Sequence, residues 1–77
     1  MLASLPAIIG QGADTQITLD DPEASPHHAA LARVNGELEV TDLGGQGGVQ
    51  VNGNPVAIAS LRRGDRITIG RSEIVIE

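Results

Sequence analysis

The chain has 77 residues, no cysteine, no aromatic residue and a formal net charge of −5, with five arginines and no lysine. This length suits one small domain with a thin aliphatic core, and the lack of cysteine excludes disulfides and thiolate metal sites. The acidic balance argues against nucleic acids and anionic membranes as partners, and no apolar run reaches the roughly 18–20 residues of a membrane span. We therefore expect residues 1–77 to be one cytoplasmic domain, excised from a longer protein, with no membrane contact. Composition leaves its oligomeric state open.

The first part of the chain is typical of short strands separated by turns. Residues 2–9 are mostly apolar and end at a glycine, which predicts a strand. Because Pro6 lacks an N–H, we place this strand at the edge of a sheet. Residues 16–19 predict a second short strand whose isoleucine and leucine face the core. The polar stretch 20–26 contains two prolines and predicts a turn.

The clearest hairpin joins residues 27–34 to residues 37–43. Between them, Asn35-Gly36 favours a type I′ turn, which needs positive φ at both positions. This turn places Leu31 opposite Val40 in the predicted register. Polar and apolar residues alternate along the segments, as a strand with one buried face requires.

The stretch 42–53 holds four glycines within five residues: Gly44, Gly45, Gly47 and Gly48. A helix would lose about 1 kcal/mol at each glycine, so the stretch predicts an irregular loop between strands. A phosphate-binding P-loop also needs Lys-Ser or Lys-Thr at the start of a helix, and the chain has no lysine. We therefore interpret these glycines as a tight interstrand loop, followed by a Val49–Val51 strand and an Asn52-Gly53 turn.

The last part of the chain predicts further strands over residues 55–58, 66–69 and 73–76, with turns over 61–65 and 70–72. Alternation along the final hairpin predicts four buried isoleucines, Ile67, Ile69, Ile74 and Ile76. Many short strands with closely spaced turns indicate an all-β fold, an antiparallel β-sandwich.

Two histidines and a serine are the candidates for metal binding or catalysis. Adjacent strand side chains point to opposite faces, so one metal ion cannot easily take both His27 and His28. Ser25 near His28 has no evident orienting acid, oxyanion donors or pocket, which argues against acyl transfer. We expect no metal, no cofactor and no enzymatic activity. The arginines between residues 62 and 71 are interpreted as a solvated face, with contact to an acidic partner as the alternative.

From Ile8 onward, the sequence resembles the forkhead-associated (FHA) family over nearly its whole length. The resemblance rests on the order and spacing of short motifs: Ile9-Gly10, Ile17-Thr18-Leu19-Asp20-Asp21-Pro22, Ser25, His28-Ala29, Asp42-Leu43, Val51-Asn52-Gly53, Leu61-x-x-Gly64-Asp65 and Ile67-x-Ile69-Gly70. It implies a β-sandwich of about 11 short strands. It also implies a protein-interaction module, of a kind that mostly reads phosphothreonine peptides with loops at one end of the sandwich.

The positions that read phosphate in the family differ here. The family's arginine after the first glycine is Gln11, and the arginine beside the retained Ser25 is Pro26. The usual serine or threonine of the glycine loop is Gly45, and the usual Asn-Gly-Thr is Gly47-Gly48-Val49. A hydrogen bond to a charged group contributes about 1.5–3 kcal/mol, so loss of two arginine contacts weakens phosphate binding by about 3–6 kcal/mol.

The framework residues are retained: His28, which braces the loops in the family, and Asn52 and Gly53, which we interpret as turn residues. We therefore expect a bacterial signalling module that binds a protein or peptide without needing phosphate, and no nucleic acid. The expected binding residues are Gln11, Ser25, Pro26, His28, Gly45, Gln46, Gly47 and Gly48.

Two alternatives stay open. Ser25 and the glycine-loop amides could form an anion nest that binds phosphothreonine peptides weakly. The domain could instead serve a structural or assembly role in a larger transporter, secretion or signalling protein.

Overall fold

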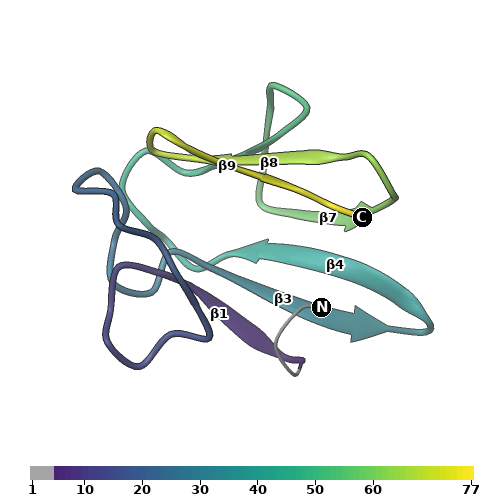
Figure 1. The fold of residues 1–77 in the computed structure, drawn as a ribbon. Coiled ribbons are helices and arrows are strands. Elements are labelled where there is room, and N and C mark those ends of the chain that lie inside the picture. Colours follow the sequence, from purple (N-terminus) through teal and green to yellow (C-terminus); the bar gives the residue numbers. More distant parts are fainter. Residues whose placement is uncertain (1–4) are drawn as a thin grey trace.

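The computed structural model describes residues 5–77, and within that range the chain is all-β, with nine strands and no helix. In chain order the strands are β1 (Ala7–Gly10), β2 (Ile17–Thr18), β3 (Ala29–Val34), β4 (Glu37–Asp42), β5 (Val49–Val51), β6 (Asn54–Val56), β7 (Ile58–Leu61), β8 (Arg66–Ile69) and β9 (Ser72–Val75). A five-stranded sheet in the order β2-β1-β3-β4-β7 lies against a four-stranded sheet in the order β6-β5-β8-β9 (Figure 1). The predicted β-sandwich is confirmed, with nine strands in the described range rather than about 11.

The core fills the space between the two sheets. Leu31 and Val40 of the five-stranded sheet and Ile67 of the four-stranded sheet are fully buried. Because the chain has no aromatic residue, these aliphatic side chains supply the main stabilisation, at roughly 1.5–3 kcal/mol each. The expected burial of the final isoleucines is confirmed, since Ile67, Ile69 and Ile76 are buried and Ile74 is partly buried against them.

Two Asn-Gly turns set the register of neighbouring strands. Asn35 and Gly36 have φ values of 51° and 81°, and the β3–β4 pair places Leu31 opposite Val40 as predicted. Asn52 and Gly53, at 52° and 84°, turn the chain from β5 into β6. Positive φ at both central positions matches the twist of the strands they join.

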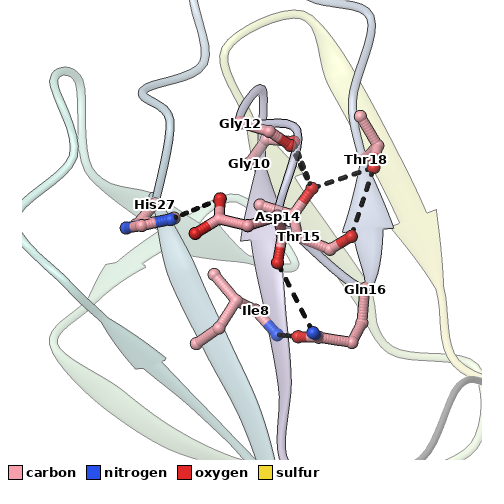
Figure 2. A network of polar contacts seen from close by, with 8 residues as sticks. All are labelled: Ile8, Gly10, Gly12, Asp14, Thr15, Gln16, Thr18 and His27. Carbon is pink, nitrogen blue, oxygen red and sulfur yellow. Dashed lines mark hydrogen bonds and ion pairs between the residues drawn. The ribbon is translucent and has the colours of Figure 1, made fainter.

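The position of β1 differs from the sequence expectation. β1 lies inside its sheet, between β3 and the two-residue strand β2, with which it pairs in parallel. The backbone N–H of Gln16 donates to the Ile8 carbonyl, and the Gln16 side chain accepts the Ile8 N–H at 2.8 Å (Figure 2). The prediction that this strand lies at the edge of the sheet was wrong, because Gln16 and the two residues of β2 form hydrogen bonds along the outer side of β1. Pro6 precedes the strand, and residues 2–4 of the predicted strand lie outside the described residues.

The loops that carry the predicted site gather at one end of the sandwich, on the left in Figure 1. We call this the loop end and define it as residues 11–16, 19–28 and 43–48 together with the β8–β9 turn at residues 70–71. In the part of the chain that the structure describes, no helix has the length and apolar character needed to cross a membrane.

Candidate functional site

Ser25 links three segments of the loop end. Its carbonyl accepts the Gln11 N–H at 3.1 Å, and its hydroxyl oxygen accepts the Gln46 N–H at 3.0 Å. Its own N–H donates to Nδ1 of His28 at 3.0 Å. The β1–β2 loop and the glycine loop are therefore both tied to one serine in the β2–β3 loop.

His28 forms a fully buried brace beneath these loops. Because Nδ1 accepts the Ser25 N–H, the ring proton lies on Nε2, which donates to the Gly48 carbonyl at 2.8 Å. The ring also lies against Gly45, where an added Cβ would come within 2.5 Å of two of its carbons. The backbone at residue 45 therefore lies closer to the histidine ring than it could if this residue had a side chain.

The amides of the glycine loop are largely used within the protein. The Gly44 N–H donates to the Asp42 carboxylate at 2.8 Å, and the Gly48 N–H donates to the Gly45 carbonyl at 3.1 Å. The Gln46 N–H is bonded to Ser25, so three of the five amides between residues 44 and 48 have internal acceptors. An anion reaching this loop would have to displace these bonds.

The β1–β2 loop is held by its own polar network (Figure 2). The Thr15 hydroxyl donates to the Gly12 carbonyl at 2.7 Å, and His27 Nε2 lies 2.9 Å from Asp14 Oδ1. This contact with His27 is the main cause that lowers the pKa of Asp14 below its ordinary value of 3.8. Gln11 lies at an exposed position in this loop.

Asp21 joins the β2–β3 loop to the β8–β9 turn and is only 3% exposed. Its carboxylate accepts hydrogen bonds from the Ser72 hydroxyl at 2.7 Å, from the Arg71 N–H at 2.8 Å and from the Glu23 N–H at 2.9 Å. The Ser72 bond, followed by the Glu23 bond, lowers the pKa of Asp21 below 3.8, so this carboxylate is ionised at neutral pH. Arg71 also reaches Glu23 through its side chain, with Nε 2.7 Å from Oε2.

A groove of about 510 Å³ opens at the loop end beside the glycine loop. Two of its lining residues, Gln50 and Thr68, pair across β5 and β8. The lining residues are Pro22, Glu23, Gln46, Gly47, Gly48, Gln50, Thr68 and Gly70.

The structure brings all eight sequence-predicted site residues to the loop end. Gln11, Pro26, Gln46 and Gly47 are exposed there, whereas His28 is buried and can influence a partner only through the loops it braces. Sequence reasoning missed the groove residues outside the glycine loop, and it did not predict that Asp21 and Arg71 contact each other. The polar character of residues 20–23 was a weak signal, but nothing local paired them with a turn about 50 residues later.

The two histidines diverge, since His27 contacts Asp14 at the surface and His28 points into the protein. Among residues 5–77, no cluster of three or more His, Cys, Asp or Glu side chains is arranged to hold a metal ion.

Comparison with known proteins places this geometry in a family. A family model for the FHA domain matches residues 7–70. The glycogen accumulation regulator GarA of Mycolicibacterium smegmatis is 39% identical over 66 residues, an alignment that covers 86% of this chain and 42% of GarA. The chain therefore spans less than half the length of that relative.

Solved structures share the sandwich. The FhaA FHA domain, crystallised in complex with the intracellular domain of Rv3910, superposes with a TM-score of 0.90 at 35% identity, covering 97% of this chain and 82% of that chain. An FHA domain studied for phosphothreonine-dependent interactions superposes with a TM-score of 0.89 at 35% identity, covering 96% and 77% of the two chains. Because the family model, the sequence identity and the fold agree over most of its length, this chain belongs to the FHA domain family, a family of protein-interaction modules.

Proposed function

We propose that the loop end binds an extended segment of a protein partner and that this binding does not require a phosphoryl group. The proposal rests on one observation: the groups that would have to bind a phosphate are replaced or already bonded within the protein. Gln11 and Pro26 occupy the positions where the family has arginines, and Ser25 and most glycine-loop amides are bonded within the protein.

The charge of the loop end supports the same conclusion. Asp14, Asp20, Asp21 and Glu23 contribute four carboxylates to it, and Arg71, the arginine of its β8–β9 turn, is paired with Glu23. A phosphothreonine carries a charge of about −1.5 to −2 at neutral pH, so it would approach a surface of its own sign. The exposed end suits a neutral or basic segment better than a phosphorylated one.

The relatives support a polypeptide as the partner. One similar FHA domain was solved with the intracellular domain of another protein bound, and another was studied for phosphothreonine-dependent interactions. This chain shares their scaffold, and we propose that it shares the protein partner and has lost the dependence on phosphate.

The test compares two short degenerate peptide libraries, one with a fixed central threonine and one with phosphothreonine at the same position. Binding to the domain is measured by fluorescence anisotropy. We expect the two libraries to bind within about threefold of each other, which corresponds to about 0.6 kcal/mol. Binding of the phosphorylated library alone would reject the proposal and favour a residual anion nest.

A variant provides the matched positive control. Gln11→Arg introduces the family's cation at an exposed position just after β1, where a charge-assisted bond contributes about 1.5–3 kcal/mol. We expect this variant to favour the phosphorylated library by about tenfold or more. A variant with no such preference would show that the missing arginine at residue 11 does not explain phosphate independence.

A further inference from the structure

One acidic residue lines the groove at the loop end. Among the described residues that line it, Glu23 is the one ionisable side chain, and the remainder contribute two amide side chains, a hydroxyl, a proline and glycines. The Glu23 side chain is 52% exposed, so a partner group in solution can reach its carboxylate. Gln50 and Thr68, which also line the groove, carry neutral side chains with oxygen acceptors.

A second carboxylate, that of Asp21, lies close to Gly70, a residue that lines the groove. A Cβ added to Gly70, which lines the groove, would lie 2.9 Å from Asp21 Oδ2. The negative charge of Asp21 is therefore separated from the groove by a residue that has no side chain. Since Asp21 is nearly buried and held by neutral donors, its field is less screened by water than that of a surface carboxylate.

One guanidinium opposes these two carboxylates. Arg71 pairs with Glu23 through Nε, but its side chain is 79% exposed and does not line the groove. Exposed ion pairs of this kind are weak and exchange readily with solvent. A cationic group that enters the groove can share or replace this contact.

We propose that the groove takes a lysine or arginine side chain of the partner segment, with Glu23 as the carboxylate that receives it. This inference rests on the proposed function and adds the chemistry of the partner. Charge complementarity favours a basic side chain at this groove. The groove offers carboxylate, amide and hydroxyl oxygens to an ammonium or guanidinium group. An acidic side chain would instead be repelled by the negative charges of Glu23 and Asp21. Arg71 acts as an internal competitor that limits the affinity.

The experiment uses unphosphorylated peptides with a fixed central threonine and with lysine, norleucine or glutamate at each flanking position in turn. At one position we expect the lysine peptide to bind about fivefold more tightly than the norleucine peptide, the upper range for an exposed ion pair. Glutamate at that position should bind most weakly. Raising the salt from about 0.05 M to about 0.5 M should reduce the lysine preference.

Three variants make the test specific. Glu23→Gln should abolish the lysine preference, and Arg71→Gln should increase it because the internal competitor is gone. Glu37→Gln changes an exposed carboxylate of the β3–β4 hairpin and should leave the preference unchanged. Circular dichroism checks that each variant retains its strands.

The outcomes separate this inference from the proposed function. Equal binding of lysine and norleucine peptides, or full preference retained in Glu23→Gln, would overturn the inference alone. Failure of every unphosphorylated peptide to bind would overturn the proposed function and, with it, the inference. Light scattering that shows a dimer lost in Glu23→Gln would assign the groove to a second copy of this chain and also overturn the inference.

Discussion

At the scale of single residues, the loop end depends on a contact between a glycine and a histidine ring. Gly45 lies so close to His28 that a Cβ would come within 2.5 Å of the ring. The ring cannot move away freely, because both its nitrogens are hydrogen-bonded, one to Ser25 and the other to Gly48. The family's serine or threonine at this position would not fit the loop as this chain folds it.

The close contact predicts that a methyl group added at residue 45 destabilises the domain. Gly45→Ala should lower the free energy of unfolding by about 1–3 kcal/mol, as overpacking of a closed site does. Urea denaturation measures the change. Gly47→Asn is the control, since φ at Gly47 is +85°, nothing lies within 4 Å of its Cβ position and asparagine tolerates this backbone region. Equal stability of Gly45→Ala and the wild type would show that the ring has room to move.

At the scale of elements, one carboxylate connects loops that belong to different sheets. Asp21 follows β2 of the five-stranded sheet, and its partners Arg71 and Ser72 lie at the turn into β9 of the four-stranded sheet. Because the folded pKa of Asp21 is below its ordinary value of 3.8, the ionised form stabilises the fold above that pH. This stabilisation is lost as the pH falls through the lowered folded pKa.

Asp21→Asn should therefore lower the urea midpoint at neutral pH, because the amide cannot replace the charged acceptor for the Ser72 hydroxyl and the Arg71 N–H. The difference from the wild type should shrink as the pH is lowered below 3.8, where the wild-type carboxylate also becomes protonated. Asp20→Asn, at the exposed neighbouring carboxylate, should leave the midpoint unchanged. A gap between Asp21→Asn and the wild type that does not change with pH would contradict the charge argument.

At the scale of the whole molecule, stability comes from a small aliphatic core between two sheets. Ile67 is fully buried at its centre, whereas Ile58 on β7 is 58% exposed. The same substitution therefore has different consequences at the two sites, since only the buried one leaves a cavity.

Ile67→Ala should lower the free energy of unfolding by about 2–5 kcal/mol, a large share of the roughly 5–15 kcal/mol that a domain has. Ile58→Ala should lower it by less than about 1 kcal/mol. Chemical denaturation of both variants at one temperature compares them directly. Similar losses at the two positions would mean that the core does not centre on β8.

The loop-end geometry explains why only part of the candidate site was predictable. Ser25, His28 and the four glycines stand out in the sequence through motif spacing and composition. The groove residues Gln50 and Thr68 do not, because a polar strand residue lines a groove only when the fold brings other segments beside it. The same holds for Arg71, which reads as a turn residue until the fold brings it to Asp21 and Glu23.

The sequence by itself determined most of the strands, the Asn35-Gly36 register and the buried isoleucines, because strand alternation and positive-φ turns are local properties of a few neighbouring residues. It did not separate β6 from β7: the single strand predicted over residues 55–58 is divided between two strands that belong to different sheets. Only the tertiary structure decided that β1 lies inside its sheet, that Gln50 and Thr68 line a groove and that Asp21 joins the β2–β3 loop to the β8–β9 turn. These contacts join residues up to about 50 positions apart. Their geometry depends on how the two sheets place the loops, which no local pattern records.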